Sequence, residues 1–463
     1  MRSRHLGILA TLALASLLAA ASASAQERPP APVPSTTTES QRVLGLAEVE
    51  RSALELHPQL LVARATTNVA SAQADQARAP MLPQVVGTAS YTRETGNFAP
   101  RPGAIPTTTG TTTGAVGAGP NNSLFSTSYD YWQFGLSATQ LIYDFGQTSE
   151  RYHAAKLNAE SQRLAERTAK LSILLNVRRA YFNARANKEL VDVARETLGD
   201  QNKHLAQVQG MVQVGTQPPI ALAQQKASVA NAVVQLITAQ NNYETAKAQL
   251  NQAAGLPQGT DYDVSDEDTG PLPDEDMPLE TLVAKAVAAR PEIATLVRQR
   301  EAQQATLSSA KGGYGPSIGA TAGVTDVGLN LTQLVPNWDV GVGVTWPIFQ
   351  GGLTKGQVRQ AEAQIDSVDA QRSLEELQVR LDVDSARLAV RAAKATIGAV
   401  DDALASAREQ LRLAEQRYST GVGNIIELTD AQVAYTTAAA QVVQARYGLA
   451  SARAQLLAAL GRT

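Results

Sequence analysis

The sequence WQFGLSATQLIYDFGQ (Trp132–Gln147) recurs as WDVGVGVTWPIFQGGL (Trp338–Leu353), a shift of 206 residues (338 − 132). The same shift places Trp132–Gly255 over Trp338–Gly461 without an insertion or deletion. A repeat longer than about 200 residues is a duplicated structural half rather than a short solenoid unit. We therefore expect two copies of one unit, here read as strand, strand, long helix, turn and helix.

An earlier stretch repeats with a different shift. LHPQLLVARA (Leu56–Ala65) lies over ARPEIATLVR (Ala289–Arg298) with a shift of 233, so 27 extra residues (233 − 206) must lie between Pro83 and Trp132. The Thr/Gly/Pro-rich run Phe98–Ser123 is the natural place for them. We interpret residues 93–130 as a long loop inserted between the two strands of the first copy, because connecting loops tolerate changes in length.

The N-terminus predicts export. Residues 1–25 combine Arg2 and Arg4, an apolar core and the small-residue site Ala23–Ala25, which is the pattern of a secretory signal peptide. A transmembrane anchor is the weaker alternative because the apolar run is short. Residues 26–43 are Pro/Thr/Ser-rich and predict a flexible leader. Without residues 1–25 the formal charge falls from −3 to −5 (−3 − 2).

Composition argues against several classes of function. The chain has no cysteine, which excludes disulfides and thiol catalysis. It has no basic tract that would bind nucleic acid. Its 4 histidines are scattered and give no metal-ligand spacing. No nucleophile–base constellation is visible, so we expect neither an enzyme nor a cofactor.

Two stretches in each copy alternate between apolar and small polar residues. In the first copy these are Gln84–Thr92 and Tyr131–Phe145. The second copy is cleaner, with one face apolar (Trp338, Val340, Val342, Val344, Trp346) and the other small or polar (Asp339, Gly341, Gly343, Thr345). Such alternation is typical of membrane β-barrel strands. A half-buried strand of a soluble sheet gives the same signal.

Long helices follow the strands. Gln147–Gln213 and Leu353–Ser419 are rich in Ala, Gln and charge and contain no proline. At about 1.5 Å per residue each would be roughly 100 Å long. Short turns, residues 214–219 and 420–424, lead into helices of half that length. A further helix is expected from about Leu44 to Ala79. A plain coiled coil is the alternative, although strict apolar heptads are absent.

Four strands per chain cannot close a membrane barrel, and an open sheet edge has no hydrogen-bond partners in lipid. Three chains would supply twelve strands (3 × 4). If the shorter helices stack end to end, three chains also supply twelve helical columns. The fold class we expect is therefore an α+β membrane protein, a trimer in which a 12-strand barrel continues into a 12-column helical barrel. Residues 256–280, with Asp261, Asp263, Asp266 and Asp268, read as a solvated acidic linker rather than a calcium loop.

On these residues the chain resembles the TolC family of outer-membrane efflux and secretion channels. The resemblance rests on ARAPMLPQ (Ala77–Gln84), PIFQGG (Pro347–Gly352) and YSTGVGNIIELTDAQ (Tyr418–Gln432), together with the duplication and the signal peptide. It implies a trimeric barrel in the outer membrane, a periplasmic helical extension, and docking on a periplasmic adaptor (a membrane fusion protein) coupled to an inner-membrane pump. It also implies contact with outer-membrane lipid.

The resemblance assigns the two helical turns to the periplasmic tip. Their adaptor-contacting residues would be Gly215, Thr216, Gly421 and Gly423, although glycine also simply permits a left-handed helix end. Glu427 and Asp430 match paired acidic positions at the pore mouth, where carboxylates attract cations. Glu427 also has capping-box spacing from Asn424. Gly423 and Ala221 replace the basic and acidic residues of the family's closing salt link, so closure would rest on packing around Tyr418 or on another network.

Two further sets of residues are expected to shape the barrel. The strand-to-helix junctions carry Gly146 in the first copy and Pro347, Gly351 and Gly352 in the second. Tryptophans at the strand ends would anchor the barrel at the lipid interface, with ordinary strand packing as the alternative; these are Trp132, Trp338 and Trp346.

The function expected from this sequence is an outer-membrane exit duct of a tripartite efflux or type I secretion system. A free-standing diffusion porin and a non-channel periplasmic coiled-coil protein are the two alternatives. The substrate, whether drugs, metals or secreted protein, is left open by the sequence.

Overall fold

A computed structural model describes residues 42–95, 128–259, 262–267 and 270–462. All but the first of these residues belong to one compact unit, Val43–Thr463. The expected signal peptide (1–25), the leader up to residue 41 and the run Phe98–Ser123 lie outside the described residues.

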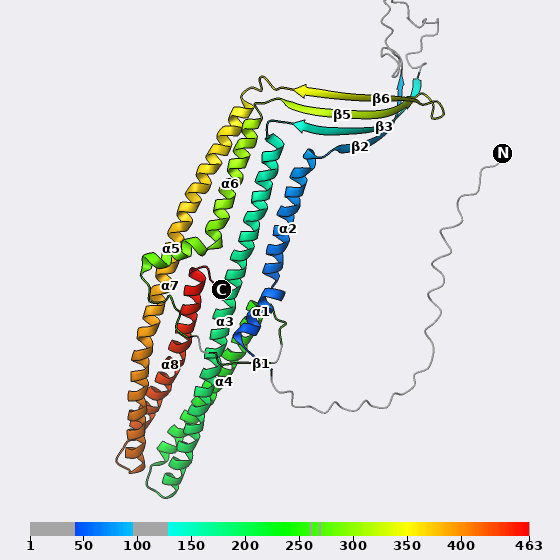
Figure 1. The fold of residues 1–463 in the computed structure, drawn as a ribbon. Coiled ribbons are helices and arrows are strands. Elements are labelled where there is room, and N and C mark those ends of the chain that lie inside the picture. Colours follow the sequence, from blue (N-terminus) through cyan, green and yellow to red (C-terminus); the bar gives the residue numbers. More distant parts are fainter. Residues whose placement is uncertain (1–41, 96–127, 260–261, 268–269, 463) are drawn as a thin grey trace, which may run out of the picture. The chain divides into compact units, whose positions relative to one another are not determined.

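Two long helices form the framework (Figure 1). Helix α3 spans Gln147–Gln213 and α7 spans Leu353–Ser419; each has 67 residues, and their bounds differ by the shift of the repeat. Gly146 and Gly352 precede them with φ of 84° and 88°, a left-handed conformation that glycine adopts without a Cβ clash. The chain then returns along α4 (Pro219–Ala254) and α8 (Ile425–Ala459). Each long helix thus forms a hairpin with a helix of about half its length.

Two pairs of shorter helices precede the strands. These are α1 (Leu46–Leu56) and α2 (Pro58–Arg78) in the first copy, and α5 (Leu279–Ala289) and α6 (Pro291–Gly312) in the second. Proline takes the first position of α2 and α6, where its missing N–H leaves no helical bond unmade. After α2 a short 3-10 turn, η1 (Ala79–Met81), ends the helix.

The shorter helices stack end to end at equivalent joints in the two copies. A Cβ on Gly255, which ends α4, would come within 3.0 Å of the His57 backbone at the start of α2. A Cβ on Gly461, just after α8, would come within 3.1 Å of the backbone of Ala289 and Arg290 at the start of α6. Both glycines have positive φ, so these close approaches require glycine. Four columns result, in the order α2/α4, α3, α6/α8 and α7.

The main sheet has four antiparallel strands in the order β2-β3-β5-β6. They are β2 (Gln84–Thr95), β3 (Ser128–Tyr143), β5 (Ser317–Gly328) and β6 (Val335–Thr345). Directly paired residues share a face, and the observed register separates the two faces by chemistry. One face is mostly apolar, with Val85, Leu136, Val324 and Trp338 across the strands, and it carries Asp326 beside Phe134. The opposite face is small and polar and includes Thr88, Gly135, Thr325 and Asn337.

The expectation of a solvated linker at residues 256–280 is wrong. Within it β4 (Tyr262–Val264) pairs with β1 (Arg42–Leu44), so the leader also ends in a strand rather than running flexibly to residue 43. Tyr262 and Val264 are fully buried. Their alternation with acidic residues lets the apolar side chains fill the core while the carboxylates meet basic partners.

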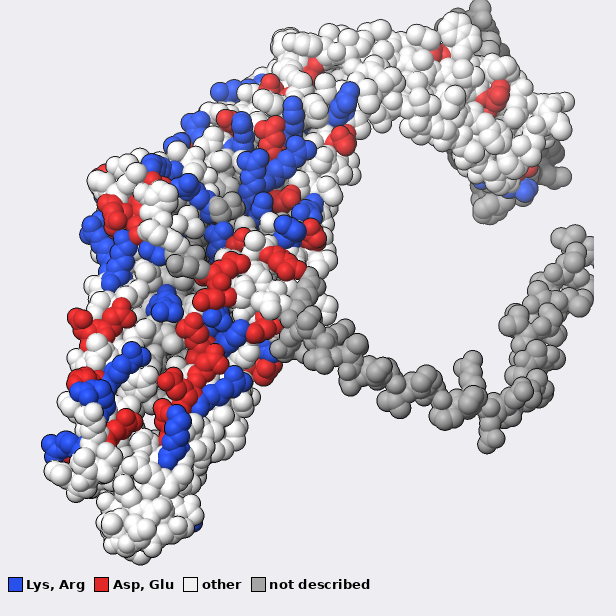
Figure 2. Space-filling view, turned by 60° about the horizontal axis from the view of Figure 1, so that its bottom comes forward, with Lys and Arg blue, Asp and Glu red and all other residues white. Residues whose placement is uncertain are grey.

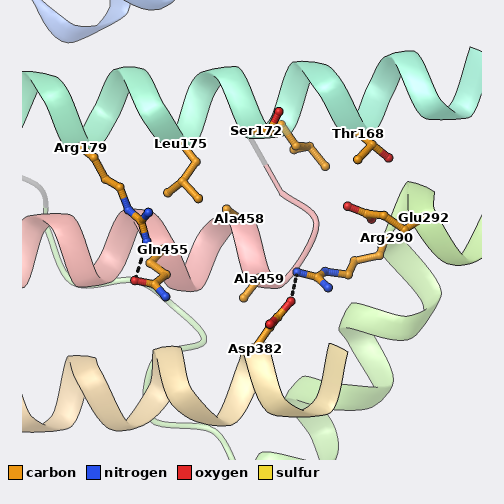
Figure 3. A pocket seen from close by; sticks show the side chains of 11 residues that line it. Thr168, Ser172, Leu175, Arg179, Arg290, Glu292, Asp382, Gln455, Ala458 and Ala459 are labelled. Carbon is orange, nitrogen blue, oxygen red and sulfur yellow. Dashed lines mark hydrogen bonds and ion pairs between the residues drawn. The ribbon is translucent and has the colours of Figure 1, made fainter. Parts of the chain in front are cut away.

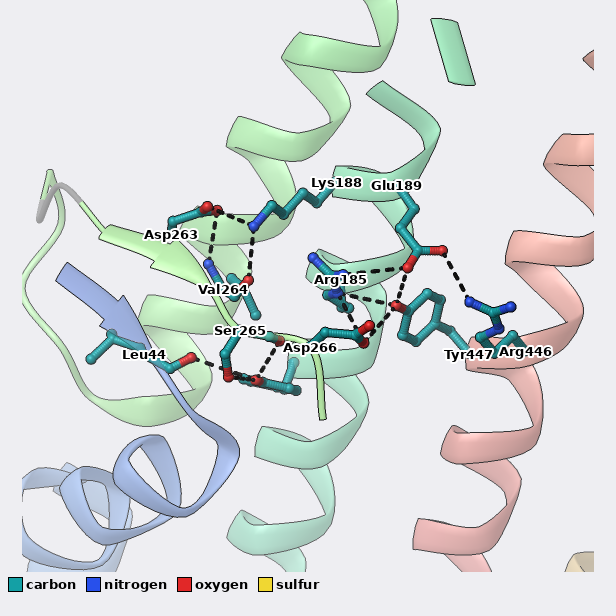
Figure 4. Close-up of polar contacts among 11 residues, drawn as sticks. Leu44, Arg185, Lys188, Glu189, Asp263, Val264, Ser265, Asp266, Arg446 and Tyr447 are labelled. Carbon is teal, nitrogen blue, oxygen red and sulfur yellow. Dashed lines mark hydrogen bonds and ion pairs between the residues drawn. The ribbon is translucent and has the colours of Figure 1, made fainter. Parts of the chain in front are cut away.

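Those partners come from the long hairpins. Lys188 of α3 donates to Asp263 at 2.6 Å, and Arg185 donates to Asp266 at 3.3 Å (Figure 4). Farther along, Glu275 is 3% exposed and accepts from Arg453 of α8 at 3.0 Å. The sequence showed the acidic residues but not their partners, which lie far away along the chain.

Candidate functional site

The first tip turn is a glycine-terminated helix end. Gly215 has φ of 80°, and the N–H of Thr216 donates to the carbonyl of Met211 at 2.9 Å. The Thr216 hydroxyl donates to the same carbonyl at 2.9 Å. Pro218 then precedes α4, whose first residue is Pro219 rather than part of the turn. The bonds at Thr216 end α3, and the two prolines restrict the backbone of the turn.

The second turn is tighter. Gly421 has φ of 79°, and the N–H of Gly423 donates to the carbonyl of Arg417 at 2.8 Å. A Cβ on Gly423 would lie 2.8 Å from the backbone nitrogen of Tyr418. Any side chain at Gly423, including a basic one, would therefore displace the turn. The basic residue of the family's closing salt link could therefore not replace Gly423 without a change in the turn.

Tyr418 lies at the centre of an apolar cluster that joins the two hairpins just above the turns. Its side chain is 1% exposed. Around it pack residues from all four helices, namely Val208, Ala221, Ala414, Leu428 and Ala431. Burial raises the pKa of the Tyr418 hydroxyl above its usual range. Because this cluster draws apolar side chains from both hairpins, packing holds the hairpins together here.

The two acidic residues, Glu427 and Asp430, have different surroundings in the structure. Glu427 forms an ion pair with Arg417 at 3.5 Å, with side chains 44% and 57% exposed. Asn424 caps α8 by accepting at 3.2 Å from the N–H of Ile426, the second residue of the helix, rather than from the N–H of Glu427 as in a capping box. Asp430 is exposed on the same helix. Asp430 is thus the freer carboxylate for a role in ion preference, which stays a prediction.

Above the apolar cluster lies a polar contact between the hairpins that the sequence did not reveal. We call it the tip seam. Gln201 of α3 donates to Gln432 of α8 at 2.8 Å and accepts from Gln225 of α4 at 2.8 Å. His204 of α3 lies 3.4 Å from Glu415 of α7, from Nε2 to Oε1. The third link joins the hydroxyls of Thr197 and Thr436 at 3.3 Å. Glutamine is so common on these helices that no pattern marks the buried ones.

The tip itself carries almost no charge. Residues 205–225 contain no Asp, Glu, Lys or Arg, and neither do residues 418–426. Figure 2 shows charges of both signs along the helices and an uncharged tip. Large aliphatic side chains are exposed there, with Val214 at 75%, Ile220 at 65%, Val422 at 76% and Ile426 at 59%. Such a surface is typical of an interaction site.

The sheet presents its apolar face unprotected. On β6, Trp338 is 78% exposed and Val342 70%, and Trp346, just after the strand, is 61% exposed. Trp132 behaves differently because its ring stacks on Tyr91 with centroids 4.5 Å apart. The Trp346 ring N–H donates to the Tyr314 carbonyl at 3.0 Å. Placement of these tryptophans at a lipid interface stays a prediction.

The junctions from strand to helix use positive φ in both copies. Gly351 and Gly352 have φ of 60° and 88°, and in the first copy Phe145 and Gly146 have 54° and 84°. Pro347 lies in the short segment between β6 and α7. The second copy thus places glycine at both left-handed positions, whereas the first tolerates a phenylalanine.

A cavity of about 280 Å³ lies at the joint between α8 and α6 (Figure 3). Arg290 pairs with Asp382 of α7 at 2.9 Å, and Arg179 of α3 donates to Gln455 of α8 at 2.8 Å. Two basic and two acidic side chains line it, counting Glu292. We interpret this balanced cavity as part of the joint rather than as a ligand site.

Comparison with known proteins identifies this architecture. A family model described as "Outer membrane efflux protein" matches residues 49–256 and 282–462. The chain belongs to the outer membrane efflux protein family. This confirms the resemblance noted from the sequence. The efflux protein family is a family of channels rather than enzymes. No helix among the described residues is both long and apolar enough to cross a membrane.

Relatives in this efflux protein family match most of the chain. Outer membrane efflux protein BepC of Brucella suis is 24% identical over 71% of this chain and 72% of its own length. Outer membrane protein TolC of Escherichia coli is 24% identical over 90% of this chain and 82% of its own. The solved CmeC outer membrane channel of Campylobacter jejuni has a TM-score of 0.74 at 20% identity, covering 90% of this chain and 85% of that one. VceC of Vibrio cholerae has a TM-score of 0.74 at 19% identity, covering 90% and 96%. The structural likeness establishes the fold.

Proposed function

We propose that three copies of this chain form an exit duct through the outer membrane, which receives substrate from a periplasmic adaptor and an inner-membrane pump. The observation that carries the proposal is that the sheet and the helical layer end at the same two edges. In the sheet order β2-β3-β5-β6, the outer edges of β2 and β6 have no neighbouring strand among the described residues. The helical columns run in the same order, with α2/α4 at one edge and α7 at the other.

Two different edges of this kind can meet when copies of the chain are related by rotation about a common axis. The contact of the β6/α7 edge with the β2/α2 edge of the next copy is heterologous, and heterologous contacts either close into rings or form filaments. A lipid-exposed sheet cannot keep open edges, which excludes the filament within a membrane. Three copies supply twelve strands, within the range of membrane barrels. The strands, of 11 to 16 residues, are long enough to cross a bilayer when tilted.

Both helical edges carry the apolar surface that such a contact needs. On α7 four leucines are 52% to 68% exposed at helical spacing, namely Leu374, Leu377, Leu381 and Leu388. On the opposite edge column the exposed aliphatic residues are Leu61, Val62 and Val69 of α2 and Val233, Val234 and Ile237 of α4. In a single chain these side chains stay in water. In a ring, each stripe meets the stripe of the next copy.

The tip is the proposed entrance and docking point. The resembled channels present their turn glycines to the adaptor, and here Gly215, Thr216, Gly421 and Gly423 occupy those turns. Because the turns are uncharged and expose aliphatic side chains, docking would rest on apolar contacts and on backbone groups. Tyr418 and its cluster, directly above, would keep the entrance narrow until the adaptor engages.

Two measurements test the proposal. Native mass spectrometry of detergent-extracted protein should give three chains, and a stable monomer or dimer would contradict the ring. Planar-bilayer recording separates a gated duct from a diffusion porin. We expect low conductance from the protein alone, since Tyr418 packs the hairpins together, and large steady conductance without an adaptor would favour the porin. A non-channel coiled-coil protein would give no detergent-dependent trimer.

A further inference from the structure

Exposed aromatic and basic side chains lie together where the sheet joins the helices of the second copy. Trp346, which follows β6 directly, is 61% exposed, and its ring N–H donates to the carbonyl of Tyr314 at 3.0 Å. Tyr314 is 54% exposed, and its backbone N–H donates in turn to the carbonyl of Lys311 at 3.2 Å. The sheet therefore leads through two aromatic residues to a lysine in the last turn of α6.

Two further cations, Lys355 and Arg359 of α7, lie on the same side as Lys311. Arg300 of α6 donates to Asp369 of α7 at 2.7 Å, which fixes the level and the face at which these helices meet. Lys311 is three turns from Arg300 (311 − 300 = 11), and Lys355 is four turns from Asp369 (369 − 355 = 14). Arg359 is one turn from Lys355. We call Lys311, Lys355 and Arg359 the junction cations.

The junction cations have no counter-charge within the part of the chain that the structure describes. All three are exposed, and none forms an ion pair or a side-chain hydrogen bond there. Farther from the sheet, the same helices do pair their cations. Arg298 of α6 meets Glu301 at 2.6 Å, and on α7 Arg372 meets Glu376 at 2.9 Å. The unpaired cations are thus found at the sheet-proximal end.

Helix stability does not explain the two cations of α7. Lys355 and Arg359 lie in the first two turns of that helix, and its first turn contains no acidic residue. The N-terminus of a helix carries a partial positive charge, so a cation there is unfavourable unless an anion lies nearby. Lys311 differs, because it lies at a helix C-terminus, where a cation is favoured.

The first copy of the repeat retains this arrangement in part. The shifts of 233 and 206 that relate the copies place Arg78 over Lys311 and His153 over Arg359. In the first copy Glu150 lies 3.8 Å from His153, whereas the equivalent position of the second copy is a glycine. Basic residues therefore recur at the sheet-proximal end of both copies, and the second copy lacks the acidic neighbour.

We propose that the junction cations bind the headgroups of anionic phospholipids in the periplasmic leaflet of the outer membrane. The proposal rests on the channel function proposed above, because it requires the apolar face of the sheet to be embedded in lipid. The occupant follows from two features of the junction. The cations need an anionic partner, and the aromatic residues beside them continue the apolar sheet face, so the partner is negatively charged and belongs to a lipid surface.

The dimensions of the junction fit a headgroup layer. The polar layer on each side of a bilayer is about 5–7 Å thick. At about 1.5 Å per residue, Lys355 lies roughly 3 Å and Arg359 roughly 9 Å along α7 from its first residue. Long basic side chains at this depth extend toward the phosphates while their stems stay on the protein. Figure 2 shows a nearly uncharged sheet and, directly beyond it, Lys and Arg side chains on the ends of the helices.

The expected effect is a preference for anionic over zwitterionic lipid at the junction. One Lys or Arg near an anionic surface strengthens binding about fivefold at moderate ionic strength. Because three cations share a small area, we expect a total preference of about five- to twentyfold. In about 1 M salt the screening length falls to about 3 Å, and the preference should fall below about twofold.

Trp346 provides a reporter for the lipid at this junction. The chain has 3 tryptophans, so Trp346 is the only one left in the full-length protein carrying Trp132→Phe and Trp338→Phe. This protein is reconstituted into vesicles of phosphatidylglycerol and phosphatidylcholine, in which one lipid or the other carries bromine on its acyl chains. Bromine quenches the fluorescence of a neighbouring tryptophan. The quenching at each composition gives the relative affinity of the two lipids for the site.

Three sets of substitutions are compared in this background. The first removes the junction cations: Lys311→Gln, Lys355→Gln and Arg359→Gln. The second exchanges them with retention of charge: Lys311→Arg, Lys355→Arg and Arg359→Lys. The matched control removes three exposed cations that lie far from the sheet: Lys226→Gln, Arg391→Gln and Arg408→Gln. The first set should reduce the preference for phosphatidylglycerol to less than about twofold, whereas the other two sets should keep it.

The outcomes separate the lipid site from the channel. Equal quenching by the two lipids in the unsubstituted junction, or a preference that survives removal of the three cations, would overturn the lipid site and leave the proposed function standing. Loss of the trimer in either lipid when the cations are removed would show that they join neighbouring copies instead. If neither brominated lipid quenches Trp346, the sheet is not embedded, which contradicts the proposed function and the lipid site together.

Discussion

Replacing Glu275 by glutamine should strongly lower the local stability of residues 270–280, the segment between the two copies. The Glu275 side chain is 3% exposed and is held by Arg453 at 3.0 Å and by Lys394 at 2.7 Å. It also accepts from the N–H of Leu272 at 3.2 Å. Removing one member of a buried ion pair costs about 3–5 kcal/mol, because the other charge stays buried without its counter-charge. A neutral amide at this position would take a counter-charge from Arg453, whose side chain is 12% exposed, while Lys394 would keep Asp276 at 3.0 Å.

Hydrogen–deuterium exchange of the detergent-solubilised protein measures this directly. A loss of about 3 kcal/mol raises local exchange by roughly a hundredfold or more if the segment opens on its own. Glu280→Gln is the matched control, since Glu280 pairs with Arg380 in solvent, with side chains 71% and 50% exposed. It should change exchange less than about fivefold. Equal exchange in the two variants would refute the view that residues 270–280 are held by a buried ion cluster.

The same carboxylate predicts a pH dependence. Burial by itself would raise the pKa of Glu275, but hydrogen bonds from Lys394 and Arg453 outweigh it, and the pKa lies below its usual range. A lowered folded-state pKa gives stability that is present above the ordinary value near 4.5 and is lost as pH falls through the folded value. The free energy of opening of this segment, obtained from the exchange rate relative to the intrinsic rate at each pH, should therefore be steady at neutral pH and fall in acid. Glu275→Gln should remove that fall.

Three further outcomes are expected. Tyr418→Ala removes a buried ring at a cost of about 3–5 kcal/mol and should widen the tip and raise conductance. Tyr418→Phe keeps the ring and should leave the conductance low. Equal conductance of the two variants would show that the cluster does not narrow the entrance. Asp430→Asn should reduce the preference for cations, measured as a reversal potential. Glu427→Gln should reduce it less, because Arg417 already offsets the charge of Glu427. No change in either variant would show that neither carboxylate lines the pore. Val342→Arg, on the apolar face of the sheet, should cost about 2–4 kcal/mol and impair membrane insertion. Thr321→Arg, on the polar face, should still insert. Similar insertion of the two variants would contradict the assignment of the apolar face to lipid.

The framework of the fold could be predicted from the sequence because its signals are local and repeated. Alternation marks the strands, and the absence of proline marks α3 and α7. Glycine and proline mark the turns near Gly215 and Gly421. Because the shift of the repeat is constant, the element bounds read in one copy could be compared with those read in the other. The structure places helices and strands at nearly the same bounds, with the strands displaced by up to three residues.

What could not be predicted depends on contacts between distant segments. The acidic linker looked solvated because Lys188 and Arg453, which hold it, lie in other parts of the chain. The joints at Gly255 and Gly461 require glycine only because another backbone passes close by. The tip seam was missed for a similar reason, since His204 and Gln201 look like ordinary helix residues until the second hairpin packs against them.

Disulfide cross-linking between sheet edges tests the central claim most directly. The chain has no cysteine, so one cysteine in β6 at Gly341 can be combined in turn with cysteines in β2 at Val86, Thr88 or Ser90. A bond requires Cα atoms within about 7 Å, which within one chain is prevented by the two strands that lie between β2 and β6. If three copies close the barrel, at least one pair should give a denaturing-gel ladder that ends at three chains. A ladder that ends at two, that continues beyond three, or that never forms for any pair would contradict the account.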